Sequence, residues 1–231
     1  MTEIKRNKIY SALTKVSSWT GLSRIFGLIR DIATTNLLGA SVFHDIFVVT
    51  LKIPNLFRRF FAEGAFNQAF IPIYSDYQKS NDEKNTQEFI NALAGSFLSI
   101  LFLFTILVLL VTPVFIFIFA PGFYYEESKR ILAIDLLRIM FPYLALISLV
   151  SFASGIQNTH DRFSVPAFTP LIFNITLIIA ATLIAPMLDL PVYALAWGVL
   201  IAGFLQLLIH IYALKNINRL PKPNINFSHS G

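Results

Sequence analysis

Four long stretches without a charged residue constrain the fold of this chain more than any other feature. No Asp, Glu, Lys or Arg occurs for 37, 22, 26 and 25 residues in the intervals 89–125, 139–160, 163–188 and 190–214. A helix needs about 20 apolar residues to cross the hydrocarbon core of a bilayer. Each stretch therefore predicts one membrane-spanning helix, at about 89–114, 136–157, 165–186 and 192–214.

The composition agrees with a membrane protein. Of the 231 residues, 55% are hydrophobic and 13% are charged, whereas a soluble domain carries about 25% charged residues. Four buried core helices in a soluble protein are the alternative, but they would leave almost no polar chain to cover them. The chain has no Cys and its four His are scattered, so we expect no metal and no cofactor. The aromatic residues are spread through the spans and form no stacking platform, so no nucleic acid partner is expected.

The first 75 residues allow two interpretations. The segments 10–38 and 42–62 are moderately apolar, but both contain basic and acidic residues. They are either two amphipathic helices on the membrane surface or two further spans whose charges are turned inward. Ionisable residues inside a bilayer normally face the bundle interior or a wet cavity. The second interpretation gives six spans in one transmembrane lobe, residues 1–215, followed by a polar cytoplasmic tail at 216–231.

The distribution of basic residues predicts the orientation. With six spans, 12 of the 18 Lys and Arg residues fall on the side of the N-terminus, and only Lys129 and Arg130 fall on the other side. Cytoplasmic loops are enriched in basic residues, so we expect both termini in the cytoplasm. If the first two segments lay on the membrane surface instead of crossing it, both termini would still lie on the same side of the membrane. The segment 74–88 is strongly polar and is expected to be a cytoplasmic loop.

The first helix carries two arginines among small residues. Ser23, Arg24, Gly27, Arg30 and Asp31 lie within nine residues. Arg24 and Asp31 are expected on nearly one helix face, with Arg30 about 120° round, and the small residues allow close helix packing. One interpretation is that both guanidinium groups point into a cavity and bind an anion such as phosphate. The other is that Arg30 reaches the membrane interface while Arg24 pairs with a carboxylate.

The second helix carries a polar stripe interrupted by a proline. Asp45, Lys52 and Arg59 recur every seven residues. Pro54 removes one backbone donor from this helix, and Asn55 is placed to satisfy local backbone groups. A kinked intramembrane helix beside charges usually lines a cavity or a moving element. We therefore expect a structural hinge at Pro54 and Asn55.

Other polar residues are less specific. Arg58 and Glu63 fall near the cytoplasmic end of the second helix, where an arginine is also common as an interfacial anchor. Asp45 either lines the cavity or neutralises an arginine of the first helix. Lone polar residues in the apolar helices are expected to form interhelical hydrogen bonds; they are Asn174, Gln206 and His210.

Several blocks of the sequence resemble the MurJ (MviN) family of lipid II flippases. They are SRIFGLIRD at 23–31, DIFVVTLKIPNLFRRFFAEGAFNQAFIP at 45–72, APGF at 120–123, FPY at 141–143 and NTHDRFSVPAFTPLIFN at 158–174. The resemblance extends over about residues 9–223. It implies an all-α integral membrane fold, a six-helix bundle that forms one lobe of a multidrug/oligosaccharidyl-lipid/polysaccharide exporter. It also implies a transporter and not an enzyme, which moves lipid II from the inner to the outer leaflet of the cytoplasmic membrane by alternating access.

The resemblance also implies binding residues. The family's cavity positions match Arg24, Arg30, Arg58, Ser23, Asp45 and Glu63. These residues would hold the pyrophosphate of lipid II, the undecaprenyl-pyrophosphate-linked disaccharide peptide, while the prenyl tail stays among the membrane lipids.

Family members normally have fourteen spans in about twice as many residues, so the chain is expected to be the N-terminal half. It would be half of a transporter, paired with a separately encoded C-terminal lobe, or an inactive truncated remnant. An intramembrane undecaprenyl-pyrophosphate phosphatase, with Asp45 and Glu63 as its acid–base groups, is the alternative from another class.

Overall fold

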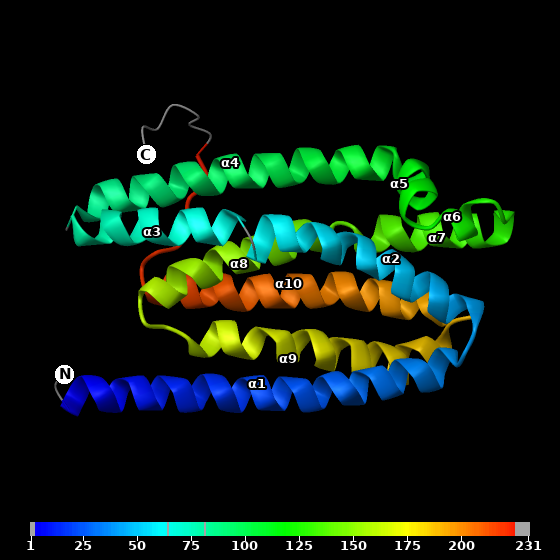
Figure 1. The fold of residues 1–231 in the computed structure, drawn as a ribbon, viewed down its shortest axis with the longest axis horizontal. Coiled ribbons are helices and arrows are strands. Elements are labelled where there is room, and N and C mark those ends of the chain that lie inside the picture. Colours follow the sequence, from blue (N-terminus) through cyan, green and yellow to red (C-terminus); the bar gives the residue numbers. More distant parts are fainter. Residues whose placement is uncertain (1–2, 64, 81, 225–231) are drawn as a thin grey trace.

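The computed structural model describes residues 3–63, 65–80 and 82–224 and is helical almost throughout this range, without β-strands (Figure 1). For residues 3–9, 11, 12, 62, 63 and 65–67 it describes the backbone alone. The longer helices are α1 (Glu3–Leu38), α2 (Val42–Arg58), α3 (Ala65–Lys79), α4 (Glu83–Leu110), α7 (Glu127–Met140), α8 (Tyr143–Thr159), α9 (Ser164–Ile179) and α10 (Val192–Asn216). Shorter segments are the π-helical turn Arg59–Glu63 after α2, then α5 (Thr112–Phe119), α6 (Pro121–Tyr124), and the turns Ala180–Ile184 and Ala185–Met187 after α9.

Four helices of the described chain are long and apolar enough to cross a membrane. They are Glu83–Leu110, Glu127–Thr159, Ser164–Met187 and Val192–Asn216. Each contains most of one predicted span, so each charge-free stretch lies in a helix of sufficient length to cross a membrane. The first ends earlier than predicted because α5 starts a new helix with Pro113 in its first turn, where the missing proline N–H removes no helical hydrogen bond.

The helices α1 and α2 are not among these four, and they lie apart from each other. α1 is attached to the bundle almost wholly through α9, whereas α2 packs on α7 and α8. The turn between them contains Gly39, whose φ of +59° is a conformation that side chains with a Cβ rarely adopt. Ser41 then caps α2 by accepting a hydrogen bond from the backbone N–H of His44. This arrangement separates α1 and α9 from α2 by the width of the bundle interior (Figure 1).

Two apolar clusters hold the bundle together. The first joins α2, α7, α8, α10 and the turn after α9, and it includes Ile46, Leu137 and Leu195. The second joins α3, α4 and the later turns of α8 and α10, and it includes Ile90 and Ile156. Because none of the described side chains of α1 is a fully buried apolar member of either cluster, the position of this part of α1 depends on polar and partly buried contacts with α9.

The prediction of a loop at 74–88 was wrong. The helix α3 continues into this segment and α4 begins within it, with residues 80–82 between them. Tyr74 is fully buried, and Tyr77 stacks on Phe89 with ring centroids 4.5 Å apart. Asp82 caps α4 through a 3.0 Å bond from a backbone N–H. The segment therefore has an apolar face, although most of its residues are polar.

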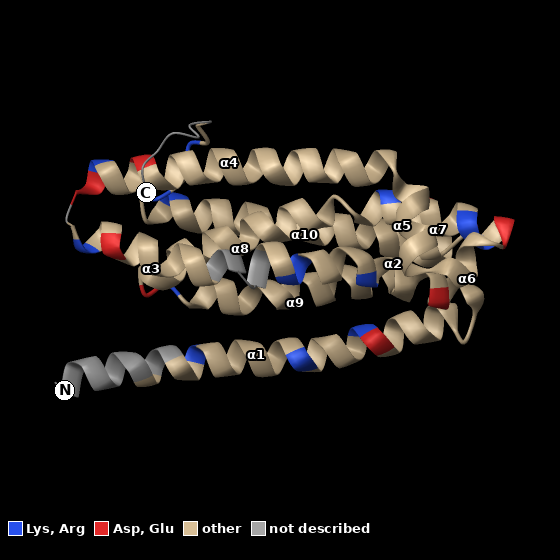
Figure 2. Ribbon diagram, turned by 45° about the horizontal axis from the view of Figure 1, so that its top comes forward, with Lys and Arg blue, Asp and Glu red and all other residues tan. Residues whose placement is uncertain are grey.

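Both ends of the described chain lie at one end of the bundle, together with the α3–α4 turn (Figure 1). Figure 2 shows acidic and basic residues gathered at the two ends of the bundle, and further basic residues along the middle of α1 and α2.

Candidate functional site: a cavity lined by basic residues

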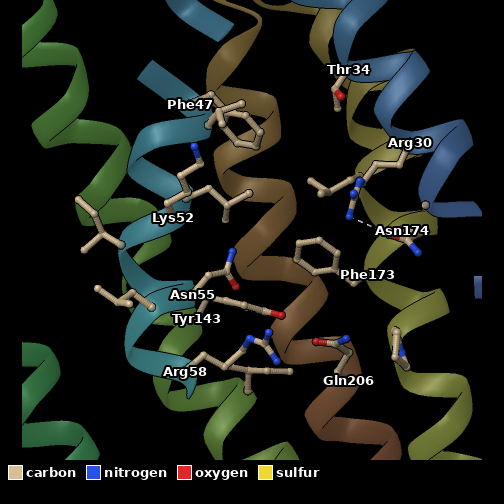
Figure 3. Close-up of a pocket in the computed structure, with 18 of the residues that line it drawn as sticks. Arg30, Thr34, Phe47, Lys52, Asn55, Arg58, Tyr143, Phe173, Asn174 and Gln206 are labelled. Carbon is tan, nitrogen blue, oxygen red and sulfur yellow. Dashed lines mark hydrogen bonds between the residues drawn. The ribbon is translucent and has the colours of Figure 1, made fainter. Parts of the chain in front are cut away.

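A cavity of about 1330 Å³ lies between α1 and α9 on one side and α2 on the other, with α8 and α10 between them (Figure 3). Small-molecule sites usually measure about 300–1,000 Å³, so this cavity has room for a larger ligand. Arg30 lines it from α1, Lys52 and Arg58 line it from α2, and Arg59 lines it from the π-helical turn that follows. In Figure 3 the side chains of Arg30 and Arg58 point into the space between the two walls, whereas that of Lys52 runs along α2 toward Phe47.

Arg30 is oriented by contacts on both sides of its guanidinium group. Its Nη1 donates to Asn174 Oδ1 on α9 at 2.9 Å, and its Nε and Nη2 donate to Asp31 Oδ1 at 3.0 and 2.6 Å. The guanidinium carbon also lies 5.8 Å from the centroid of the Phe173 ring. A guanidinium group has five N–H donors, so these three bonds leave two donors for a ligand in the cavity.

Asn174 joins α9 to α1 as well as holding Arg30. Its Nδ2 donates to the backbone oxygen of Ser23 at 2.9 Å. A Cβ at Gly27 would lie 3.6 Å from the same Nδ2, an ordinary van der Waals distance, so the contact does not itself require glycine. The expected interhelical hydrogen bonding of Asn174 is confirmed, and the contact with Arg30 gives this buried residue a second role that the sequence did not indicate.

The wall formed by α2 presents Lys52, Asn55 and Arg58, which follow one another at intervals of three residues. At about 1.5 Å per residue they span about 9 Å of helix. Pro54 is buried in the same helix and does not line the cavity. Thr50 lies four residues before it and donates its hydroxyl to the backbone oxygen of Ile46 at 2.6 Å. The helix continues through Pro54, and the hinge role stays a prediction.

Three of the predicted binding residues whose side chains are described do not line the cavity in this structure. Arg24 is exposed on α1, and the cavity lining begins one turn later, at Gly27. Ser23 is buried against α9, and Asp45 is exposed in the first turn of α2. The side chain of Glu63 lies outside the described residues, so its role stays a prediction. Among the described residues of the predicted set, the cavity thus brings together Gly27, Arg30, Asn55 and Arg58.

Neutral polar residues complete the lining, and no binding role was predicted for them. They are Asn174, Gln206, Ser154 and Tyr143, among others. A polar residue in an otherwise apolar span is the signal that could have identified them. Such residues more often bond to a neighbouring helix, and the sequence alone does not distinguish the two roles.

A buried polar network ties α8, α9 and α10 together behind the cavity. His210 is fully buried, and its Nδ1 accepts a hydrogen bond from Gln157 Nε2 at 2.7 Å. Its Nε2 therefore carries the proton and donates to Thr169 Oγ1, also at 2.7 Å. Gln206 Nε2 donates to the backbone oxygen of Thr169 at 3.0 Å. These bonds confirm the interhelical role predicted for Gln206 and His210.

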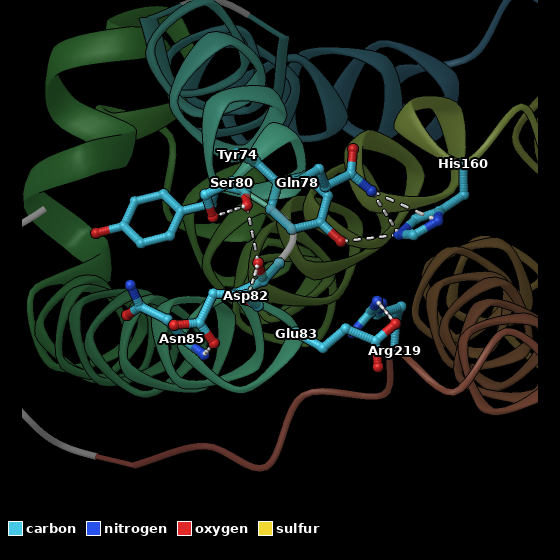
Figure 4. A network of polar contacts seen from close by, with 10 residues as sticks. Tyr74, Gln78, Ser80, Asp82, Glu83, Asn85, His160 and Arg219 are labelled. Atoms are coloured by element: carbon cyan, nitrogen blue, oxygen red, sulfur yellow. Dashed lines mark hydrogen bonds and ion pairs between the residues drawn. The ribbon is translucent and has the colours of Figure 1, made fainter.

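A second polar network lies at the end of the bundle that holds both chain ends (Figure 4). His160 Nε2 accepts hydrogen bonds from Tyr74 Oη at 2.9 Å and from Gln78 Nε2 at 2.8 Å. Burial raises the pKa of Tyr74 to about 12, so the phenol keeps its proton and donates it. Burial, and then the charge of Arg219, lower the pKa of His160. The neutral imidazole is therefore the form that accepts both bonds.

The cavity is chemically suited to an anion with several oxygen atoms. Lys and Arg side chains only donate hydrogen bonds, and they pair well with phosphate oxygens. The surrounding helices are apolar, and a charge pair is stronger at low dielectric than in water. Within the described ranges, no group of three or more His, Asp or Glu residues is placed to hold a metal ion.

Long apolar helices around an interior cavity lined by basic side chains define a multi-pass helical membrane protein. The sequence profile of one family, described as lipid II flippase MurJ, matches residues 34–231. The chain belongs to this family.

Relatives of known name match nearly the whole chain. A probable lipid II flippase MurJ of Buchnera aphidicola subsp. Acyrthosiphon pisum is 42% identical over 95% of this chain and 43% of its own length. The lipid II flippase MurJ of Burkholderia cenocepacia is 38% identical over 94% of this chain and 42% of its own length. A solved structure titled "Lipid II flippase MurJ, inward closed conformation" is 29% identical, with a TM-score of 0.75 over 92% of this chain and 43% of that one. The chain therefore spans less than half the length of these relatives.

Proposed function

We propose that the chain takes part in moving lipid II from the inner to the outer leaflet of the inner membrane by alternating access, as one lobe of a transporter. One observation carries the proposal: Arg30 and Arg58 point into a single cavity from two facing helices of an apolar bundle (Figure 3). The relatives named as lipid II flippases support it. A second lobe, in the same or a separate chain, would supply the other side of the pathway.

In this proposal the pyrophosphate of lipid II binds between the two walls. Arg30 offers its two remaining N–H donors from α1, Arg58 approaches from α2, and Lys52 adds a positive charge beside it. The prenyl tail stays in the bilayer, because moving each CH₂ group from lipid to water costs about 0.8 kcal/mol. Arg24 lies on α1 closer than Arg30 to the end of the bundle that holds both chain ends. In the proposed orientation this end is cytoplasmic, so a pyrophosphate entering from the cytoplasm would meet Arg24 before Arg30.

The proposed orientation places both termini in the cytoplasm, and labelling can test it because the natural chain has no Cys. Ser80 lies in the α3–α4 turn and Ser128 in the first turn of α7, and both are exposed. We expect an impermeant thiol reagent to label Ser128→Cys in intact spheroplasts and Ser80→Cys only after the membrane is opened. The reverse pattern would invert the topology.

The function is tested by complementation of a cell depleted of its own flippase. The chain would be fused to the part of the Burkholderia relative that lies beyond the aligned region. We expect Arg30→Ala and Arg58→Ala to abolish growth, while Lys79→Ala, an exposed residue paired with Asp76, supports it. Growth of both arginine variants at the control rate would contradict the proposal.

An assay for phosphate release distinguishes the proposed transporter from an intramembrane phosphatase. A phosphatase would need an acid–base group beside the bound pyrophosphate, but Asp45 does not line the cavity, and Asp31, which does, is paired with Arg30 through Oδ1. We expect the purified chain to release no inorganic phosphate from undecaprenyl pyrophosphate. Release that disappears in Asp45→Asn would favour the phosphatase instead.

A further inference from the structure

Gln206 on α10 has an amide oxygen that the described protein leaves without a partner. The residue is 2% exposed and lines the cavity (Figure 3). Its Nε2 is engaged with the backbone oxygen of Thr169 at 3.0 Å. Its Oε1 is buried and accepts no hydrogen bond from any described residue. Buried polar atoms in native proteins are nearly always hydrogen-bonded, so this atom needs a donor from outside the described protein.

The chemistry of the atom defines the group that could satisfy it. An amide oxygen only accepts hydrogen bonds, so its partner must be an O–H or an N–H. The oxygens of an ionised pyrophosphate also only accept, and they cannot fill this place. Arg30, Lys52 and Arg58 have the opposite character, because they only donate. The cavity therefore offers donors for an ionised phosphate and also an acceptor, beside Arg58, for a neutral group that carries hydroxyl or amide hydrogens (Figure 3).

Other neutral groups lie in the same cavity. Asn55 points into it from α2, between Lys52 and Arg58 (Figure 3). Ser154 lines it from α8; its hydroxyl donates to the backbone oxygen of Val150 at 2.8 Å. The Ser154 oxygen keeps capacity to accept a bond, since a hydroxyl oxygen has two lone pairs.

We propose that the Gln206 end of the cavity is a subsite for a sugar, with Oε1 of Gln206 accepting a hydrogen bond from a sugar hydroxyl or acetamido N–H. The proposal rests on the proposed function, since a pyrophosphate held by Arg30 and Arg58 places the attached sugar beside it. The volume of about 1330 Å³ leaves room for both groups.

The test measures the binding of two lipids to the chain in nanodiscs. One probe is a prenyl pyrophosphate, and the other is the same lipid with one N-acetylhexosamine on its pyrophosphate. We expect Gln206→Met to lose about three- to tenfold in affinity for the sugar-bearing probe, the usual effect of one hydrogen bond. Its affinity for the sugar-free probe should not change.

Gln157→Met is the matched control. Gln157 is also a buried amide, 1% exposed, whose Oε1 has no partner among the described residues, but it does not line the cavity. We expect its affinities for both probes to equal those of the unmodified chain. If Gln206→Met binds the sugar-bearing probe normally, or if both variants lose the same affinity, the subsite is refuted and Oε1 is a hydration site only.

A measurement on the unmodified chain does not depend on the folding of a variant. Methylating every hydroxyl and the amide of the sugar removes its donors, and we expect the affinity to fall to that of the sugar-free probe. An unchanged affinity would refute the subsite. The proposed function has a separate test here: if Arg30→Ala binds both probes normally, the pyrophosphate site is wrong, whatever the sugar does.

Discussion

At the scale of single residues, Asn174 determines where the charge of Arg30 lies. It accepts from Arg30 Nη1 at 2.9 Å and donates to the backbone of Ser23 at 2.9 Å. One buried amide thus fixes both the distance between two helices and the direction of the guanidinium group. An arginine without such a partner would be free to pair with Asp31 alone or to turn toward the membrane surface.

Two substitutions of Asn174 should therefore differ in effect. We expect Asn174→Ala to weaken binding of a prenyl pyrophosphate about tenfold, since a hydrogen bond to a charged group is worth about 1.5–3 kcal/mol and the charge itself remains. Asn174→Asp should weaken it as much as Arg30→Ala, because a second carboxylate beside Arg30 neutralises it. Binding in nanodiscs measures both. Equal affinities for the Ala and Asp variants would show that Asn174 does not act through Arg30.

Helical periodicity predicted which residues of α1 lie on one face of the helix, but not the residue at which the cavity lining begins. Gly27, Arg30, Asp31 and Thr34 lie on the face that lines the cavity, whereas Arg24 precedes it. The position of that boundary depends on how α1 packs on α9, and residues 30 and 174 are 144 positions apart. The pattern of residues in a single sequence does not indicate which residues of α1 and α9 are in contact.

At the scale of elements, the segment after α10 is fastened along α4, and we call residues 217–224 the C-terminal strap. Asn91 accepts from the backbone N–H of Lys222 at 2.8 Å and of Asn224 at 3.1 Å. Arg219 lies 3.4 Å from Glu83 Oε1 (Figure 4). The sequence predicted only a polar tail here, because these bonds use backbone groups that no residue pattern indicates.

Gly95 makes the docking of the C-terminal strap possible. A Cβ at this position would lie 2.3 Å from the backbone oxygen of Asn224, so Gly95→Ala should displace the strap from α4. We expect trypsin to cut after Arg219 several times faster in this variant. Gly122→Ala is the control, because a Cβ at Gly122 meets open space. Unchanged cleavage in Gly95→Ala would show that the strap is not held there.

The network around His160 should loosen in acid. The folded-state pKa of His160 is lowered, so the unfolded or opened state binds the proton first as the pH falls through about 6.5. The stabilisation is complete above that pH and is lost below it, because a protonated Nε2 cannot accept from Tyr74 or Gln78. Asp161, Arg162 and Arg219 are the charged groups nearby.

Hydrogen exchange measures this effect. Protection of amides in α3 and in the C-terminal strap, corrected for intrinsic rates, should fall between pH 8 and pH 5. In His160→Asn it should be independent of pH over the same range. An equal loss in the variant would assign the effect to another group.

At the scale of the whole molecule, the four long apolar helices were predictable, whereas the position and extent of the cavity were not. A helix in lipid must be apolar along about 20 residues, and that requirement is visible in any single sequence. The cavity exists because α1 packs on α9, whereas α2 packs on α7 and α8. That separation follows from packing between distant segments. The inward-facing charges of α1 and α2 indicated a cavity, but they did not give its extent or its neutral lining.

The most direct test of the central claim is whether water and a pyrophosphate lipid share the space beside Arg30. Thr35 lines the cavity, whereas Ile32 on the same helix is 51% exposed and lies outside it. An impermeant anionic thiosulfonate should modify Thr35→Cys rapidly, and a prenyl pyrophosphate should slow that reaction, while Ile32→Cys stays unreactive in lipid. Equal reactivity at the two positions, or no protection at Thr35→Cys, would contradict a basic, water-filled cavity that binds pyrophosphate.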